Sequence, residues 1–256
     1  MINFFRKVRK QSADDNKPLK YFRYAIGEIL LVVIGILIAL SINTWNNERN
    51  NRIEEYQILE GLKNEFEFNL QALYNDLNKN RKVIITVDSI IALIHTNTLS
   101  NEPDNLDRLL ITMGAMGSFD ARTGFIDEII SSGKLNLITN QQLKIQLTRW
   151  SGLLNDAKED NKYVSDNYTH MLMPFLIKYF PLANGDLYKD LSQYSKYYIE
   201  KERLKSPFKS NIKGINLMEF ENILWHHRHN LDYVELNDLE IEAFIKTTVE
   251  MITKEL

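Results

Sequence analysis

A run of 18 residues from Ala25 to Ile42, AIGEILLVVIGILIALSI, is the feature that most limits what this 256-residue chain can form. Glu28 is the only charged residue in the run, and aromatic residues flank it within residues 21–24 and at Trp45. At about 1.5 Å per residue, a helix from Ala25 to Trp45 is roughly 30 Å long, which matches the hydrocarbon core of a bilayer. Aromatic residues at both ends are typical of membrane-spanning segments. The sequence therefore predicts a transmembrane helix over residues 24–45.

Basic residues are concentrated ahead of this run. Among the first 23 residues, seven are Lys or Arg and two are acidic, whereas residues 24–256 carry a net charge of −8. Lys and Arg are retained on the cytoplasmic side of a membrane segment. We therefore expect residues 1–23 to form a cytoplasmic tail and residues 46–256 to lie in the periplasm, outside a bacterial inner membrane. The residues expected to set this orientation are Arg6, Lys7, Arg9, Lys10, Lys17, Lys20 and Arg23.

The run has two other interpretations besides an anchor. Ala39-Leu40-Ser41 has the small-x-small pattern of a cleavage site, and Ile29–Ile38 could serve as the hydrophobic region of a signal peptide. The long basic stretch ahead of the run and the helical pattern that continues past Trp45 favour an uncleaved anchor. A buried core helix is disfavoured by the length of the run and by its basic and aromatic flanks.

The rest of the chain has the composition and periodicity of a helical protein. With 10 Gly and 5 Pro, it has few of the turn residues that β-barrels and β-sandwiches require. Apolar residues recur at alternating steps of three and four over Tyr56–Ile94 and Leu143–Phe175, with polar interruptions at Lys63, Asn80 and Asn161. The two stretches predict antiparallel helices of similar length that pack together in a bundle, in preference to an extended two-stranded coiled coil.

Capping and helix-breaking residues predict the other boundaries. The first long helix is expected to end within Asn97–Asp104, and a short helix to run from Pro103 to Met116. A later helix is expected to stop at Gly133. Further helices are expected to start at Asn140 and at Asn216, the latter together with Glu219. Asp186 is expected to begin a tyrosine-rich helix through Tyr198, and Asp238 is expected to begin a last helix. Pro174 is expected to kink or end the second long helix. The predicted fold is all-α: one N-terminal transmembrane helix followed by an antiparallel helical-bundle ectodomain.

Two segments resemble a known family. The stretch YFRYAIGEILLVVIGILIALSINTWNNER, Tyr21–Arg49, is similar to the N-terminal signature of an uncharacterised family of single-pass membrane proteins from Bacteroidota bacteria, domain-of-unknown-function family 6090. The block SSGKLNLITNQQLKIQL, Ser131–Leu147, is similar to the other recurring segment of that family. The resemblance implies an inner-membrane anchor that carries a helical extracytoplasmic domain. It implies no activity and transfers no catalytic residues.

Recognised chemical motifs are missing from the sequence. The chain has no cysteine, which excludes disulfides and thiolate sites. It has no GxSxG, GxxxxGK[ST] or GxGxxG motif, so we expect neither enzymatic activity nor a cofactor. The net acidic charge after the run argues against nucleic-acid binding. Arg122, Asp127 and Glu128 lie near an expected helix break and are interpreted as helix-end charges or solvated pairs.

The only cluster of histidines is formed by His226, His227 and His229. On a helix, His226 and His229 share a face, which makes them weak candidates for metal ligands, whereas His227 falls on the apolar stripe. The HExxH spacing of metalloproteases is missing. We therefore predict no metal site, and expect a surface pair of histidines beside one that is partly buried.

Glu28 is the polar residue in the most costly predicted position, about one turn inside the membrane. Gly35, Ala39 and Asn43 fall on the same helical face, and Gly35-xxx-Ala39 is a small-xxx-small pair that allows close helix approach. One interpretation is a shared interface, with a protein partner or a second copy of the chain. The other is that Glu28 extends to the lipid headgroups and that Gly35 is incidental.

Two functional classes follow from these observations. The first is a membrane-anchored helical periplasmic module that binds, senses or scaffolds, with the lipid bilayer and a protein partner as its contacts. The alternative is a subunit of a membrane complex in which Glu28 takes part in ion or proton movement. The single acidic residue near an interface and the short tail favour the first class. An extracytoplasmic enzyme ranks third.

Overall fold

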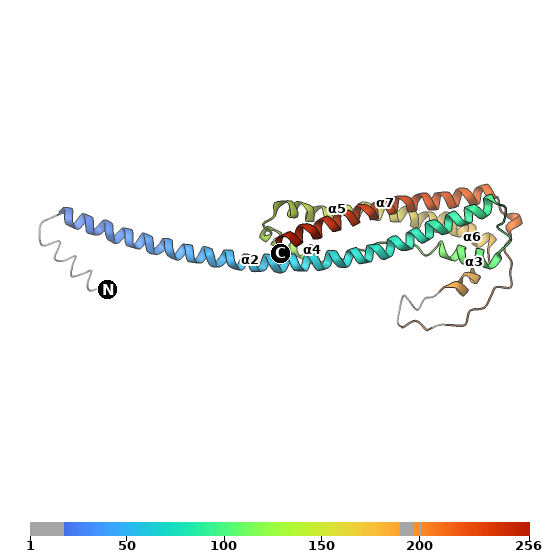
Figure 1. Ribbon diagram of the computed structural model, residues 1–256, viewed down its shortest axis with the longest axis horizontal. Helices are drawn as coiled ribbons and strands as arrows, with labels where there is room; N and C mark the ends of the chain where they lie inside the picture. Colours follow the sequence, from blue (N-terminus) through green and yellow to red (C-terminus); the bar gives the residue numbers. More distant parts are fainter. Residues whose placement is uncertain (1–17, 190–196, 200) are drawn as a thin grey trace. The chain divides into compact units, whose positions relative to one another are not determined.

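The computed structural model describes residues 18–189, 197–199 and 201–256, and all regular structure within them is helical (Figure 1). The α-helices are α2 Pro18–His95, α3 Pro103–Thr112, α4 Gly124–Ser131, α5 Gln141–Asn167, α6 Met173–Tyr179 and α7 Leu217–Glu255. Short 3-10 helices span Lys134–Leu137, Leu182–Tyr188 and Ile212–Gly214, and a π-helix, Tyr168–Leu172, joins α5 to α6. The chain forms two compact units, Met1–Gln57 and Ile58–Leu256. The prediction of an all-α protein is confirmed.

The first unit contains the apolar run as part of α2, which continues without a break beyond Trp45 as predicted. The most apolar 18-residue window of the helix has a mean hydropathy of 2.7, and none of it is buried. The core helix of a soluble protein is mostly buried, so the run does not behave as one. By length and composition, α2 can serve as a membrane anchor or a signal sequence. Arg6, Lys7, Arg9, Lys10 and Lys17 lie outside the described residues.

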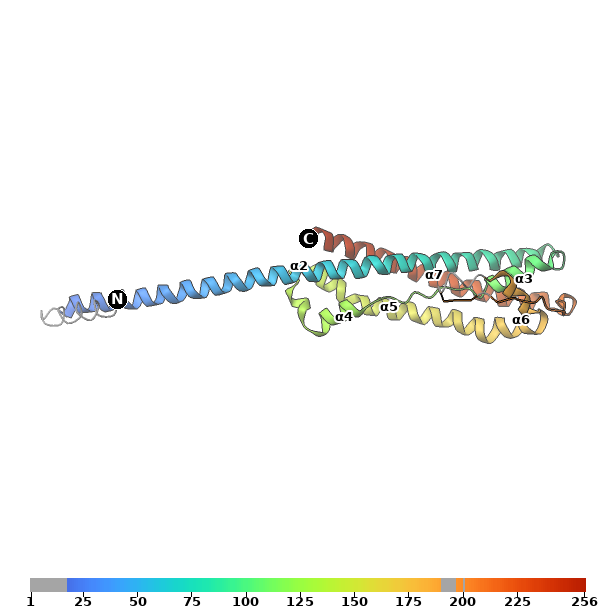
Figure 2. The same cartoon turned by 90° about the horizontal axis from the view of Figure 1, so that it is seen from below.

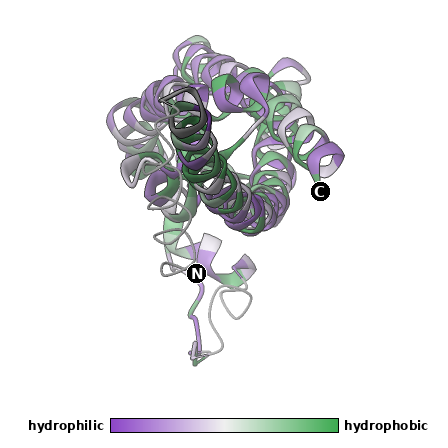
Figure 3. Cartoon of the chain, turned by 90° about the vertical axis from the view of Figure 1, so that its left-hand side faces the viewer, coloured by the Kyte–Doolittle hydropathy of each residue, from purple (hydrophilic) through white to green (hydrophobic). Residues whose placement is uncertain are grey.

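The second unit is a helical bundle built on α2 from Ile58 onward, on α5 with α6, and on α7. These helices lie side by side in two perpendicular views (Figures 1 and 2). Green hydrophobic and purple hydrophilic positions alternate around them (Figure 3), as expected for helices that bury one face. The apolar stripes of α2 and α5 pack together as predicted. The 39-residue helix α7 is a third long helix of the bundle, where the sequence predicts two shorter ones.

The core of the bundle consists of two hydrophobic clusters. In the first cluster, Phe66 of α2 meets the Trp150 ring edge-on at 5.2 Å, and Phe244 of α7 stacks on the same ring at 5.4 Å. In the second cluster, Phe175 of α6 stacks on Phe220 of α7 at 4.9 Å. Because α7 contributes residues to both clusters, it connects them along the full length of the bundle.

A polar layer separates the two clusters. On α2, Asn80 lies between Leu77 of the first cluster and Val83 of the second. On α7, Asp238 occupies the corresponding position between Val234 and Ile241. Asn80 and Asp238 are both about 1% exposed. The Asn80 side chain also accepts a hydrogen bond of 2.9 Å from the Gly117 backbone N–H, which ties the segment between α3 and α4 to the same layer.

The expected helix starts at Asn140 and Asn216 are confirmed. The Asn140 side chain accepts hydrogen bonds from the backbone of Gln142 and Leu143, and the Asn216 side chain accepts one from Glu219. These bonds satisfy N–H groups that have no partner inside the helix. Gly133 has a φ of +75°, the left-handed conformation predicted for the residue that stops the preceding helix.

Three expected boundaries are wrong. Asp238 does not begin a last helix, because it lies inside α7. Val234, Asp238 and Ile241 are spaced by four and three residues, so all three face the core from one continuous helix. Asp186 lies inside a 3-10 helix instead of capping a tyrosine-rich one, and most of residues 190–200 lie outside the described part of the chain. The helix from Pro103 ends at Thr112 instead of Met116, since the chain must then cross α2 so closely that a Cβ on Gly117 would lie 2.8 Å from the Cα of Asp76.

Candidate functional site

The predicted membrane-helix face lies on one uninterrupted stretch of α2. Glu28, Gly35, Ala39 and Asn43 are all exposed, and the helical spacing places them on a single face. A Cβ added at Gly35 would meet no atom within 4 Å. The space beside Gly35 is therefore open to another helix, and a larger side chain there would not disturb the fold of this chain.

Asn167 holds two of the three clustered histidines. Its amide nitrogen donates to Nδ1 of His226 at 2.7 Å, and its oxygen accepts from Nδ1 of His227 at 3.2 Å. Asn167 is the last residue of α5, directly before the π-helix. The widened turn of a π-helix shifts the side chains that follow it, and such turns are frequent at functional sites. The Nδ1 atom of His226 therefore already has a hydrogen-bond partner within the bundle, the Asn167 side chain.

His227 is completely buried, so the expectation that it would be only partly buried is wrong. Burial is the main cause that lowers the pKa of His227 to about 4; the neighbouring His226 acts in the same direction, and the nearby Met113 backbone opposes it. The Tyr168 ring lies 5.9 Å from the imidazole. His227 is consequently a neutral core residue at physiological pH.

The exposed side of α7 carries a stack of rings that the sequence analysis did not single out. His229 stacks on Trp225 at 4.9 Å and meets Tyr233 edge-on at 5.0 Å. His229 is held in this stack, whereas His226 is bonded to Asn167. The two imidazoles that were weak candidates for metal ligands therefore have different neighbours. Within the described residues, no group of three or more His, Asp or Glu side chains is arranged to hold a metal ion.

The buried carboxyl group of Asp238 is the most perturbed acid of the bundle. Burial is the main cause that raises the pKa of Asp238 to about 7; the charges of Asp76 and Glu235 act in the same direction, and the Asn80 side chain opposes them. Neither carboxyl oxygen makes a hydrogen bond of normal geometry to the described residues. Leaving a buried polar group unpaired costs roughly 1–3 kcal/mol, so this layer reduces the stability of the bundle.

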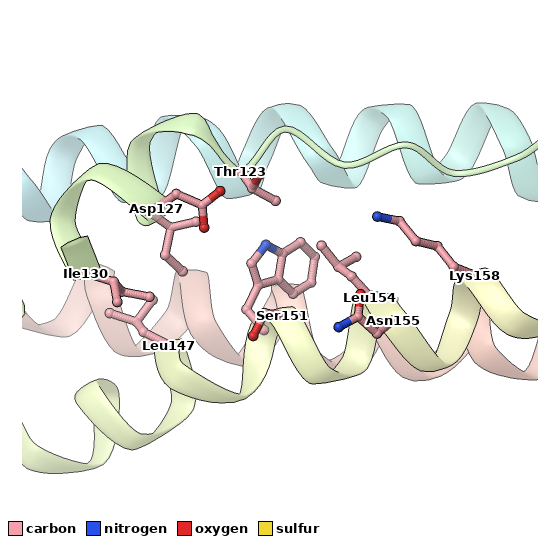
Figure 4. Close-up of a pocket in the computed structure, with 10 residues that line it drawn as sticks. Thr123, Asp127, Ile130, Leu147, Ser151, Leu154, Asn155 and Lys158 are labelled. Atoms are coloured by element: carbon pink, nitrogen blue, oxygen red, sulfur yellow. The ribbon is translucent and has the colours of Figure 1, made fainter.

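A small cavity of about 160 Å³ lies between α4 and α5 (Figure 4). Asp127 of α4 and Lys158 of α5 line it, and their charged ends point toward it from opposite sides. Trp150 also lines the cavity, and its indole N–H is buried without a hydrogen-bond partner among the described residues. The cavity therefore has a carboxylate at one end and an ammonium group at the other.

Of the three charged residues predicted near the helix break, only Asp127 lines this cavity. Arg122 lies outside it, with its guanidinium 3.3 Å from the centre of the Phe68 ring and its backbone N–H and C=O both bonded to Asn69 at 2.8 Å. The sequence does contain a signal for the α5 side of the cavity. Ser151, Asn155 and Lys158 form a polar row at i, i+4 and i+7 beside the apolar stripe.

A larger hollow of about 610 Å³ lies between α3 and the segment before α7. Its buried polar groups pair with one another: Asn184 donates to Asp107 at 2.8 Å, and its oxygen accepts from the Ser206 backbone at 2.8 Å. Lys205 pairs with Asp104 at 2.6 Å. These contacts hold the segment in place against α3.

Comparison with known proteins gives one match. No curated protein and no solved structure is significantly similar to the chain. A family model described as a family of unknown function, DUF6090, matches residues 28–157, which include most of the apolar run, Asn80, Asp127 and Trp150. Since this match covers just over half of the sequence, the chain belongs to the DUF6090 family.

Proposed function

We propose that this protein is a single-pass membrane protein in which residues 24–45 span a bacterial inner membrane and hold a helical periplasmic module. The observation that carries this proposal is the exposed apolar surface of α2. Ile29 is 64% exposed, Leu31 is 68% exposed, and the whole apolar window is unburied. A fully buried side chain of this kind gains about 1.5–3 kcal/mol over an exposed one. Lipid is the environment that covers such a surface on all sides.

The second unit supports a role in binding, sensing or scaffolding. It has its own core of two clusters, so it can hold a fixed surface without contributions from the apolar run. Its exposed features are a ring stack on α7 and a cavity between α4 and α5, both of which are suited to contacts with other molecules. The orientation proposed, with residues 1–23 in the cytoplasm, rests on the basic residues ahead of the run.

Reporter fusions after Lys10 and after Glu255 test this topology. We expect a periplasm-specific reporter to be active only when it follows Glu255, and a cytoplasm-specific reporter only when it follows Lys10. The opposite pattern would show that the orientation is wrong. Extraction with alkaline carbonate, combined with the mass of the mature chain, tests the anchor itself. A protein that washes off the membrane and lacks its first 41 residues would replace the anchor with a cleaved signal peptide.

A further inference from the structure

The cavity between α4 and α5 separates two opposite charges that nothing in the described chain neutralises. Asp127 and Lys158 are both exposed, and neither forms an ion pair or a side-chain hydrogen bond with a described residue. Figure 4 shows the carboxylate and the ammonium group directed toward the same space from its two ends. At about 160 Å³, the cavity is several times larger than the roughly 30 Å³ that one water molecule occupies in the liquid.

Apolar side chains also line this space, namely Ile126, Ile130, Leu147, Trp150 and Leu154. The indole N–H of Trp150 is buried, so a molecule in the cavity does not reach it.

We propose that this cavity binds a small zwitterion of the α-amino acid class. The ammonium group of the ligand pairs with Asp127, and its carboxylate pairs with Lys158. Leu147 and Leu154 supply apolar surface for a short aliphatic side chain. A ligand with a single charge would leave either Asp127 or Lys158 without a counter-charge, which makes a zwitterion the best match. The proposal does not depend on the membrane topology.

Isothermal titration of the full chain in mild detergent tests this site. The probes are glycine and L-alanine, with acetate and methylammonium as single-charge controls. We expect saturable binding of L-alanine, and binding of acetate and of methylammonium that is at least tenfold weaker. Equal affinity for L-alanine and for either single-charge probe would overturn the proposal, as would the lack of saturable binding for both amino acids.

Substitutions on the exposed rim assign the two charges. Asp127→Asn and Lys158→Gln are each expected to weaken L-alanine binding at least tenfold, while the helical circular dichroism stays unchanged because both residues are exposed. Glu159→Gln and Lys162→Gln are matched controls, since they alter exposed charges of α5 that do not line the cavity. The proposal fails if the two rim variants bind L-alanine as the unmodified chain does, or if the controls weaken binding equally.

Discussion

Two ionisable side chains in the core of the bundle have pKa values displaced in opposite directions. The pKa of Asp238 is raised from 3.8 to about 7, and that of His227 is lowered from 6.5 to about 4. Both groups are therefore held neutral by the folded state. Between about pH 4 and 6.5, the folded protein binds one more proton at Asp238 and one fewer at His227 than the unfolded chain, so their effects on the pH dependence of stability cancel.

Asp238→Asn should remove the contribution of Asp238 to the pH dependence of stability and leave that of His227. The raised pKa means that the stability linked to neutral Asp238 is present below about pH 4 and is lost as the pH rises to about 7, by up to roughly 4 kcal/mol. Relative to the unmodified chain, the variant should therefore gain stability steadily between pH 4 and 7. Denaturant unfolding followed by circular dichroism across this range measures the difference. Glu240→Gln, an exposed acid on the same helix, is the control, and equal slopes for the two variants would contradict the assignment.

His227→Gln should reveal the opposite slope. The lowered pKa means that the stability linked to neutral His227 is present above about pH 6.5 and is lost as the pH falls to about 4, by roughly 3 kcal/mol. The variant should lose less stability on acidification than the unmodified chain, whatever the cost of the substitution at neutral pH. The same unfolding series tests this, with the exposed His170→Gln as the control. Parallel curves for His227→Gln and the unmodified chain would contradict it.

At the scale of single helices, the apolar stripes could be predicted because amphipathic periodicity is a local property of the sequence. The sequence identifies Asn80 as a polar interruption of the apolar stripe of α2. It does not identify Asp238 as the second residue of the polar layer, because aspartate is a residue type that caps helices. The spacing of Leu231, Val234, Asp238 and Ile241 follows steps of three and four without a break. That spacing was the available signal that Asp238 lies inside a helix and faces the core.

Leu147→Ala tests the predicted stripe of α5. Leu147 is 1% exposed and belongs to the first core cluster. Removing a buried leucine side chain costs about 2–5 kcal/mol through lost burial and a residual cavity. Ile145→Ala on the same helix is the control, because Ile145 is 56% exposed. We expect a large drop in the denaturation midpoint for Leu147→Ala only, and similar drops for both variants would contradict the assigned core face.

Gly35→Leu tests the small-residue face of α2. If this face meets another helix, Gly35→Leu and Ala39→Leu should reduce crosslinking between chains in membranes, because bulk at these positions prevents close approach. Gly27→Leu is the control, since Gly27 is equally open but lies on a different face. Unchanged crosslinking in every variant would leave α2 as a simple anchor.

Glu28→Gln separates association from a role in proton or ion movement. An interface should tolerate this variant, because the amide retains hydrogen bonding. A role in ion or proton movement predicts that Glu28→Gln abolishes function while crosslinking is preserved.

For the whole molecule, the all-α class was predictable, whereas the number of long helices and the cavity were not. The sequence predicts two long helices, whereas the described residues form three, because α7 continues through Asp238 as one helix. Asp127 and Lys158 lie on different helices, and they reach one cavity only after the segment around Gly133–Asn140 turns the chain back along α4. Such a meeting depends on tertiary packing, which a local pattern in the sequence does not encode.

A chain shortened before Asn216 tests the role of α7 in the whole bundle. Without residues 216–256, both core clusters lose the side chains that α7 contributes, including Phe220 and Phe244. We expect the remaining bundle to be digested rapidly by protease and to aggregate. Removal of Glu255 and Leu256 alone is the control, because both are exposed. Equal protease resistance of the two truncated chains would contradict the central role of α7.

The position of α7 after the other helices also affects how the chain is made. Ribosomes add about 5–20 residues per second, so the apolar stripe of α2 waits on the order of ten seconds for α7 to be synthesised. During this interval neither core cluster can close, and uncovered apolar side chains are the surfaces that chaperones bind and that lead to aggregation. Synonymous codons that slow elongation between α2 and α7 lengthen this exposure, so the mRNA sequence contributes to the yield of folded protein.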